Sequence, residues 1–410
     1  MKITPVKGTN DYLPSQVRVR DAVQNKILEV YRAAGFERIT TPIMEDMENL
    51  DKSDGGENLN LIFKILKRGE KLDKALAEGG DLCDFGLRYD LTLPLTRYYA
   101  NNRAKLMNPF RVIQTDRVYR AERPQKGRLR EFVQCDIDII GTKSRTAELE
   151  LILTTAKALD SVGIKNTTVK INDRRLLRSL LAGMGFAEDS LDSVCIIFDK
   201  LDKIGPEGIA AEMTEKGLPQ QAVNKLTELL NKGLDFETLR AANPCEAAED
   251  LAFIMDSIRS VGGVNIEFDI SLVRGQGYYT ATVFEVVSPE FRGAIAGGGR
   301  YDNLVGKFIG EEVPAVGFSI GFERICAILE EKGASAAELR PRLAVVYDPA
   351  DFAKAQAYAE DKRAKYDTAL FERPKKLNKL LSRLEEQGFD AFYTIGWEET
   401  EPRELGKSQA

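Results

Sequence analysis

The stretch from Leu106 to Gly141 constrains the fold most, because its pattern predicts two long strands joined by an oversized loop. The loop, from Ala121 to Arg130, is polar and contains a proline. In the second strand, from Phe132 to Ile140, apolar residues alternate with aromatic or polar ones. We therefore expect one face of this strand to join the core and the other to carry the chemistry.

The face left for chemistry combines an aromatic ring, an amide and two carboxylates, from Phe132, Gln134, Asp136 and Asp138. Beside it, residues 111–130 contain seven lysines and arginines but only two acidic residues, although the chain has a net charge of −6. Arginine presents a planar fork that suits phosphate oxygens. The pattern predicts a base-stacking platform next to a cationic phosphate site. The alternative is a half-buried strand with a solvated polar face, and periodicity alone does not exclude it.

Other elements follow from helical spacing and from glycines. An amphipathic helix is predicted from Val19 to Ala34, and Gly35 would end it in a left-handed conformation. A strand is expected from Phe36 to Thr41, where Pro42 follows at a sheet edge or an interface.

A long helical stretch interrupts the strands in the second half of the chain. The strand Thr167–Asn172 leads into residues 173–261, which are rich in Leu, Ala, Glu and Lys at helical spacing and are interpreted as an inserted helical subdomain. Strands are expected again at Phe268–Val273 and Thr280–Val287, before the glycine-rich stretch Gly293–Gly299.

The last part of the chain has the pattern of a small α/β module. Residues 332–342 are small and charged, as in a linker, and Leu343–Tyr347 is predicted to begin a new strand. A helix whose apolar face includes Leu377 would end at Gly388.

The chain has no histidine, which removes imidazole as a metal ligand, general base or triad member. Its five cysteines are too far apart to suggest a disulfide framework or a thiolate cluster. Chemistry here must therefore rest on carboxylates, arginine, lysine, tyrosine and amides. No apolar run approaches the ~18 residues of a membrane helix, and the start has no hydrophobic signal region, so a cytoplasmic protein without membrane contact is expected.

Short polar segments add candidate ligands. Asp90 and Thr92 would share a face at a strand end and hold an ammonium group, although a capping or turn role is an equal alternative. Arg274–Tyr279 offers an arginine, two glycines and two phenols, but it lacks the third glycine and the following helix of a dinucleotide motif. Gly297–Asp302 and Gly317–Arg324 place arginines beside glycines, and each alone is consistent with a tight turn.

In this order, the segments resemble the histidyl-tRNA synthetases, a family of class II aminoacyl-tRNA synthetases. The resemblance covers nearly the whole chain. It rests on an opening segment at Lys7–Pro14 and on the three class II motifs at Val19–Pro42, Tyr119–Phe132 and Pro314–Arg324. Two further segments, Leu272–Tyr279 and Gly298–Asp302, resemble histidine-specific ones.

The resemblance implies an α+β fold in which helices flank an antiparallel class II sheet. The implied catalytic core comes in two parts, residues 1–172 and 262–331, with a helical insertion at 173–261 between them. A linker at 332–342 would lead to a shortened anticodon-binding-like α/β domain at 343–410. The short C-terminal segment puts anticodon contacts in doubt.

The family's ATP site implies roles for several arginines. Arg120 would bind the α-phosphate and Arg128 the γ-phosphate, while Phe132 and Arg324 would lie on either side of adenine. Arg274 would bridge the histidine carboxylate and the α-phosphate, so Arg274 and Arg120 are the expected catalytic residues. Mg²⁺ would shield the charge of the pyrophosphate. No protein side chain is assigned as a ligand of this ion.

The family also implies how histidine and its tRNA would bind. The α-ammonium would be held by Asp90, Thr92 and Gln134, whereas Asp138 and Tyr279 would pair with the imidazole, beside Tyr278 and Arg274. Gln125 and Arg123 would reach the acceptor end of histidine tRNA. A homodimer would form through the motif 1 region.

The expected function is therefore that of a histidine–tRNA ligase. The alternative is a catalytically inactive paralogue that senses histidine as a regulatory subunit of ATP phosphoribosyltransferase. The shortened C-terminus favours the paralogue, but a sensor has no need for the complete ATP site. A third reading, an adenylate-forming ligase for another amino acid, requires the histidine-specific segments to be coincidental.

Overall fold

A computed structural model of the chain describes residues 3–51, 60–124, 128–198, 200–232, 235–272, 278–332, 340–398 and 401–406. The chain divides into two units. The larger contains Met1–Asn10 and Gln24–Lys332, and the smaller contains Asp11–Val23 and Gly333–Ala410. Arg274 and Gln125 lie outside the described residues, so their expected roles are not examined by the structure.

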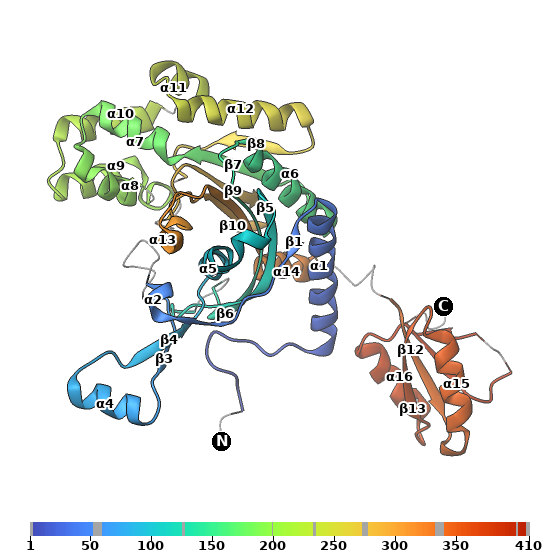
Figure 1. Cartoon of the computed structure of the whole chain (residues 1–410). Coiled ribbons are helices and arrows are strands. Elements are labelled where there is room, and N and C mark those ends of the chain that lie inside the picture. Colours follow the sequence, from blue (N-terminus) through green and yellow to red (C-terminus); the bar gives the residue numbers. More distant parts are fainter. Residues whose placement is uncertain are drawn as a thin grey trace. The chain divides into compact units, whose positions relative to one another are not determined.

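An eight-stranded sheet forms the centre of the larger unit, in the order β1-β5-β6-β11-β10-β9-β7-β8. The pairs from β5 to β7 are antiparallel, whereas the edge pairs β1–β5 and β7–β8 are parallel. The sheet curves around α5 (Thr92–Asn102) and carries α6 (Thr146–Ser161) and α14 (Phe322–Glu331) on its outer side (Figure 1). The strands are β1 (Glu37–Arg38), β5 (Phe110–Tyr119), β6 (Glu131–Ile140), β7 (Thr168–Asp173), β8 (Asn265–Phe268), β9 (Thr282–Ser288), β10 (Phe291–Arg300) and β11 (Ala315–Gly321).

The predicted hairpin is confirmed as β5 and β6, which pair without a register shift from Phe110↔Ile140 to Tyr119↔Glu131. The apolar face of β6 is core, since Cys135 is fully buried and its carbonyl accepts a hydrogen bond from Tyr31 of α1 (Pro14–Ala33). The alternative of a solvated polar face is wrong. Gln134, Asp136 and Asp138 are only 9%, 4% and 3% exposed.

The strand predicted from Phe36 to Thr41 is wrong in its extent, because β1 covers only Glu37–Arg38. Beyond it the Thr41 carbonyl is bonded by a side chain instead of a strand, since Nη1 of the fully buried Arg88 donates to it at 2.8 Å. The helix that precedes β1 ends before Gly35, which has the expected positive φ of 86°.

A small second sheet precedes α5 and has the order β2-β4-β3. The helix α4 lies between its last two strands in the sequence, and this hairpin projects away from the large sheet (Figure 1). Its elements are β2 (Met44–Asp46), α2 (Met47–Leu50), β3 (Lys64–Leu66), α4 (Glu70–Glu78) and β4 (Cys83–Leu87).

The segment after β7 is helical, as its composition predicted, and packs around its own apolar core. Its α-helices are α7 (Arg174–Met184), α8 (Leu191–Phe198), α9 (Leu201–Glu215), α10 (Gln220–Lys232), α11 (Phe236–Ala242) and α12 (Glu246–Val261). The strand expected at Phe268–Val273 is misplaced, because β8 ends at Phe268. The chain then turns, since Asp269 accepts hydrogen bonds from the Ser271 and Leu272 amides.

The smaller unit contains a four-stranded sheet in the order β13-β12-β14-β15. The first three strands pair in parallel, and the short β15 is antiparallel to β14. The predicted helix before Gly388 is confirmed, and Gly388 has a φ of 76°. The elements are β12 (Arg342–Tyr347), α15 (Phe352–Lys362), β13 (Asp367–Glu372), α16 (Leu377–Glu386), β14 (Ala391–Thr394) and β15 (Arg403–Glu404).

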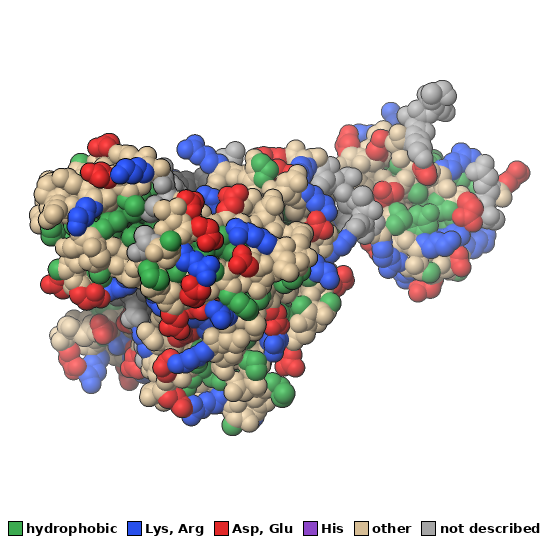
Figure 2. Space-filling view, turned by 90° about the horizontal axis from the view of Figure 1, so that it is seen from above, with side chains coloured by type: hydrophobic (Ala, Val, Ile, Leu, Met, Phe, Trp, Pro, Cys, Tyr) green, Lys and Arg blue, Asp and Glu red, His purple; other side chains and the backbone are tan. Residues whose placement is uncertain are grey.

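The surface mixes charges of both signs. On the face drawn in Figure 2, Lys and Arg side chains lie among Asp and Glu side chains. Within the described ranges, no helix is both long and apolar enough to cross a membrane.

Candidate functional site

The candidate site lies on the polar face of β6, at the centre of the large sheet. Gln134, Asp136 and Asp138 alternate along this strand and are all buried. The strand β11 runs beside it and places Ser319 opposite Asp136, and Gly317 opposite Asp138. The bend before α5 contributes Asp90, whose charge raises the pKa of Asp136 and of Asp138. These groups therefore share one polar site.

Glycines in β10 and β11 clear space for the site. The tight turns that the sequence allowed at Gly297–Asp302 and Gly317–Arg324 are not formed by Gly299 and Gly317, because these two glycines pair with each other inside the sheet. A Cβ on Gly317 would lie 1.9 Å from Asp138 Oδ1, and a Cβ on Gly299 would lie 2.8 Å from the Tyr279 ring. Glycine is needed here for close approach rather than for a turn.

Replacing Gly317 by alanine is expected to weaken binding of a ligand that uses the Asp138 carboxylate by about tenfold or more, because the added methyl must displace that carboxylate. Titration calorimetry on the purified variant measures the effect. Gly183→Ala, in α7, is the matched control because a Cβ there meets nothing within 4 Å. Unchanged affinity in Gly317→Ala would contradict the assignment of Asp138 to the binding site.

Asp138 has a raised pKa and one strong partner. Tyr301, which follows β10, donates a hydrogen bond from its hydroxyl to Asp138 Oδ1 at 2.7 Å. Burial raises the pKa of Asp138 to about 7, the charge of Asp90 adds to this, and the bond from Tyr301 opposes it. The carboxylate can therefore accept a further donor, and a nearby positive charge would stabilise its ionised form.

Asp90 has the capping role that the sequence left open, and its second oxygen stays available for a ligand. It does not end a strand, because it lies in the bend before α5, where its Oδ1 accepts a hydrogen bond from the Leu93 amide at 3.2 Å. Its Oδ2 is buried and has no hydrogen-bond partner within the described residues. Burial raises the pKa of Asp90 to about 6, while the Leu93 amide and the charge of Arg120 lower it.

Gln134 supplies a second buried acceptor that lacks a partner. Its Nε2 donates to Ser319 Oγ at 2.9 Å, whereas its Oε1 has no hydrogen-bond partner in the described chain. A buried acceptor without a partner costs roughly 1–3 kcal/mol and calls for an explanation. Asp90 Oδ2 and Gln134 Oε1 together suit a ligand that brings several N–H donors, such as an ammonium group.

Aromatic residues line the same site. Tyr278 is 6% exposed and shares a hydrogen bond with the Thr92 side chain at the start of α5. Its ring centre lies 5.0 Å from that of Tyr279 and 6.0 Å from that of Tyr301. The predicted residues Thr92, Tyr278 and Tyr279 therefore lie with the acidic group.

The arginine-rich end of the hairpin lies next to these groups. Arg120 follows β5, and its Nε donates to the Tyr89 carbonyl at 3.0 Å. Its guanidinium carbon lies 5.0 Å from the centre of the Phe132 ring. The charge of Arg120 lowers the pKa of Asp90 and of Asp136, so a cation and a ring border the acidic site, as predicted.

The other predicted arginines are less closely tied to this group. Arg324 begins α14, donates to the Ala294 carbonyl and lies 5.9 Å from the centre of the Phe291 ring. Arg128 is 55% exposed on its side chain and lies 3.4 Å from Glu122, and Arg123 is exposed. The structure therefore brings Arg120 and Phe132 together but leaves Arg123 and Arg128 at the surface.

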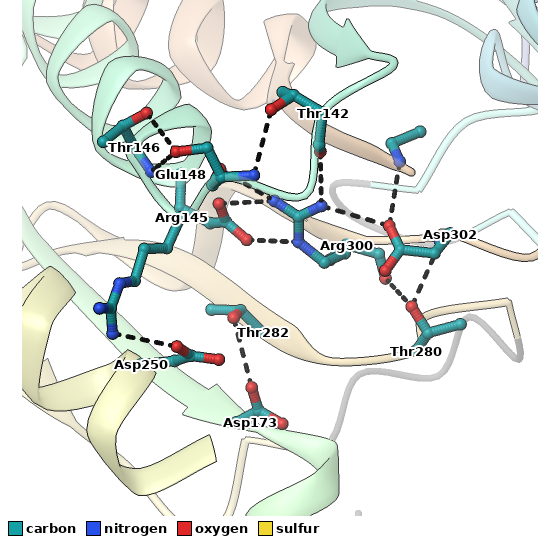
Figure 3. A network of polar contacts seen from close by, with 12 residues as sticks. Thr142, Arg145, Thr146, Glu148, Asp173, Asp250, Thr280, Thr282, Arg300 and Asp302 are labelled. Carbon is teal, nitrogen blue, oxygen red and sulfur yellow. Dashed lines mark hydrogen bonds and ion pairs between the residues drawn. The ribbon is translucent and has the colours of Figure 1, made fainter. Parts of the chain in front are cut away.

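Sequence reasoning missed the groups that hold the site in place. Arg300 is buried and forms a paired contact with Glu148 of α6, with Nε–Oε1 at 2.6 Å and Nη2–Oε2 at 2.8 Å. Its Nη1 also bonds Asp302, whose amide donates to Thr280 Oγ1 (Figure 3). This network fixes the chain on both sides of Tyr301.

Known proteins give an independent comparison. The family model for histidyl-tRNA synthetase matches residues 8–325. The chain is 41% identical to a histidine–tRNA ligase of Leifsonia xyli subsp. xyli, over 95% of this chain and 94% of that protein. It is 37% identical to a histidine–tRNA ligase of Christiangramia forsetii, over 80% of this chain and 76% of that protein.

Solved structures agree in fold. The crystal structure of histidyl-tRNA synthetase from Nostoc sp. PCC 7120 has a TM-score of 0.80 and 26% identity, and covers 96% of this chain and 91% of that one. A structure from Bacillus halodurans C, described as an ATP phosphoribosyltransferase regulatory subunit/histidyl-tRNA synthetase, has a TM-score of 0.78 and 21% identity, over 96% of this chain and 97% of that one. At that identity the second match supports the fold alone.

Proposed function

The chain belongs to the histidyl-tRNA synthetase family, and we propose that it joins histidine to the 3′ end of histidine tRNA at the expense of ATP. The observation that carries this proposal is a pair of buried acceptors, Asp90 Oδ2 and Gln134 Oε1, which have no hydrogen-bond partner among the described residues and lie beside the Arg120–Phe132 pair. An amino acid would fill the first position and ATP the second.

The amino acid binds by pairing every polar group of the site. Its α-ammonium donates to Asp90 and Gln134, with Thr92 beside them. A neutral imidazole has one donor and one acceptor, so the Asp138 carboxylate accepts from one ring nitrogen and the Tyr279 hydroxyl donates to the other. Amino acids without the ring would leave these groups unpaired and be rejected by ~10⁴-fold or more.

ATP binds where the cation and the ring meet. Arg120 holds the α-phosphate and Phe132 packs against adenine, with Arg324 on the other side of the base and Arg128 reaching the γ-phosphate. The histidine carboxylate attacks the α-phosphorus, and pyrophosphate leaves as the bond to the β-phosphate oxygen breaks. Arg274 would bridge the two reacting groups, and its fixed charge would stabilise the transition state.

Magnesium is proposed as a companion of ATP. Among the residues that the structure describes, no group of three or more Cys, Asp or Glu side chains is arranged to hold a metal ion. We therefore propose an ion that is held mainly by the phosphate oxygens of ATP. There Mg²⁺ would neutralise charge on the pyrophosphate leaving group.

The remaining contacts are proposed from the family. Arg123 and Gln125 in the hairpin loop would contact the acceptor end of the tRNA. A second copy of the chain would pair through the motif 1 region, where Ile43 and Met44 are 40% and 60% exposed. The cytoplasm, where tRNA is charged, is the proposed location.

The regulatory-subunit alternative fits less well. A histidine sensor needs the amino-acid site but not the nucleotide site, and this chain keeps Arg120 and Phe132 together beside the acidic group. Charging of histidine tRNA with labelled histidine by the purified protein, with ATP and Mg²⁺, tests the choice. Charged tRNA would support the ligase, whereas histidine binding without charging would favour the sensor.

Histidine affinity is expected to rise with pH. Asp90 and Asp138 have pKa values raised to about 6 and about 7, so in the free protein both lose charge as the pH falls below these values. Between about pH 5.5 and about pH 8, affinity should rise by up to about tenfold per pH unit for each proton released.

Calorimetric titrations across this range measure the slope. Free histidine itself loses a ring proton near pH ~6.5, so the comparison that matters is with Asp138→Asn. The variant should lose about one unit of the slope of log affinity against pH below pH ~7. An unchanged slope would contradict the binding role of the Asp138 carboxylate.

A further inference from the structure

Asp136 has no role in the proposed reaction although it lies between Gln134 and Asp138 on the polar face of β6. It is 4% exposed, and Ser319 lies directly opposite it in the sheet. Burying a carboxylate is costly, so a group kept in this position needs a physical reason.

The Gln134 amide provides that reason. An amide can turn by half a rotation and exchange its oxygen and nitrogen with little change in shape, so its neighbours decide its orientation. Burial raises the pKa of Asp136 most, whereas the Ser319 hydroxyl lowers it, as a donor to this carboxylate does. The Ser319 oxygen must then accept, and it does so from Gln134 Nε2 at 2.9 Å.

Asp136 enforces the same orientation directly. Its Oδ1 and Oδ2 lie 3.5 Å and 3.4 Å from Gln134 Nε2. In the flipped amide, the Gln134 oxygen would face the Ser319 oxygen and the Asp136 carboxylate, and all three are acceptors. The amide is thereby held with Oε1 directed elsewhere, and this buried atom has no hydrogen-bond partner among the described residues.

We propose that Asp136 and Ser319 are positioning residues, which hold the Gln134 amide so that its oxygen receives the α-ammonium of the amino acid. This inference rests on the proposed function, because it concerns the ammonium position of that same site. A flipped amide would present an NH₂ group to the ammonium and repel it. The two residues thus determine recognition of the free amino group, and neither contacts the imidazole or the nucleotide.

The charge around Asp136 supports this coupling. Burial and the neighbouring Asp138 raise the pKa of Asp136, whereas the Ser319 hydroxyl and the charge of Arg120 lower it. A bound ammonium adds another positive charge nearby. The ligand would therefore stabilise the ionised carboxylate that keeps the amide in its receptive orientation.

The test compares histidine with imidazole propionate, the analogue that lacks the amino group. Asp136→Asn and Ser319→Ala should each weaken histidine binding by about tenfold or more and leave binding of the analogue within about twofold. Thr115→Val is the matched control, because Thr115 is buried in β5 opposite Cys135 of the core face, and its hydroxyl has no hydrogen-bond partner among the described residues. It should change neither affinity by more than about twofold.

A double-mutant cycle separates positioning from a merely structural role. In a Gln134→Met background, Asp136→Asn should have no further effect on histidine binding, because it acts through the amide. Additive losses, or equal losses for histidine and the analogue, would overturn the inference while the proposed function stands. An unaltered protein that binds no histidine would remove the proposed function and the inference together. Thermal unfolding of each variant identifies one that fails to fold, and Ser319→Ala then carries the test.

Discussion

Replacing Asp138 by alanine is expected to weaken histidine binding by ~100-fold or more while leaving ATP binding within about threefold. The carboxylate is the proposed partner of an imidazole N–H, and Tyr301 already occupies its Oδ1 from the opposite side. Its removal would leave both the ring nitrogen and the Tyr301 hydroxyl unpaired in a buried site. The Arg120–Phe132 pair does not depend on this carboxylate, so ATP should bind as before.

Calorimetry with histidine and with ATP, on the same protein preparation, measures both affinities. Glu131→Ala is the control on the same strand, since the Glu131 side chain is 36% exposed and lies 3.5 Å from Arg117. It should change neither affinity noticeably. Equal losses of histidine and ATP binding in Asp138→Ala would mean that the strand is merely structural at this position.

Replacing Arg120 by alanine is expected to lower the rate of histidine activation by ~10³-fold or more, with a smaller effect on histidine affinity. The guanidinium is held by the Tyr89 carbonyl and the Phe132 ring, so it is oriented before ATP arrives. Charge that develops on the α-phosphate during attack would lose its nearest fixed cation. Arg120→Lys keeps the charge but loses the planar fork, and should recover only part of the rate.

The control for Arg120 lies on β5, the strand that precedes it. Arg117 is 62% exposed on its side chain and pairs loosely with Glu131, so Arg117→Ala should retain a rate close to that of the unaltered protein. Single-turnover formation of the adenylate measures the chemical step apart from product release. A normal single-turnover rate in Arg120→Ala would remove Arg120 from the proposed mechanism.

The hairpin and its polar face were predictable because the evidence for them is local. Alternation over Phe132–Ile140 predicted a strand with a chemical face, and β6 covers Glu131–Ile140 with Gln134, Asp136 and Asp138 buried along it. What alternation does not give is whether a polar face is solvated. The neighbouring strand and the bend before α5 cover this one, and both come from distant parts of the sequence.

Local sequence patterns do not predict which residues contact one another across the sheet. Tyr301 and Asp138 are separated by 163 residues, and Ser319 and Gln134 by 185, so only the order of the sheet, with β11 between β6 and β10, brings them together. The glycines of β10 and β11 were read as turns because sequence does not distinguish a need for positive φ from a need for close approach. The space that they leave is occupied by Asp138 and Tyr279.

Asp90 shows how two local roles can coexist. A carboxylate two residues before a helix start has the pattern of a cap, and one of its oxygens caps α5. Only the burial of the second oxygen, without a partner in the described structure, points to a ligand. That burial depends on Arg120, Tyr278 and β6 being brought together by the tertiary fold.

The most direct test of the central claim is histidine-dependent exchange of labelled pyrophosphate into ATP by the purified protein, with Mg²⁺ and without tRNA. The proposed chemistry predicts exchange with histidine and with no other common amino acid, because the reversible step forms the adenylate at the site built on β6. Histidine binding without any exchange would contradict that claim and would favour the regulatory paralogue.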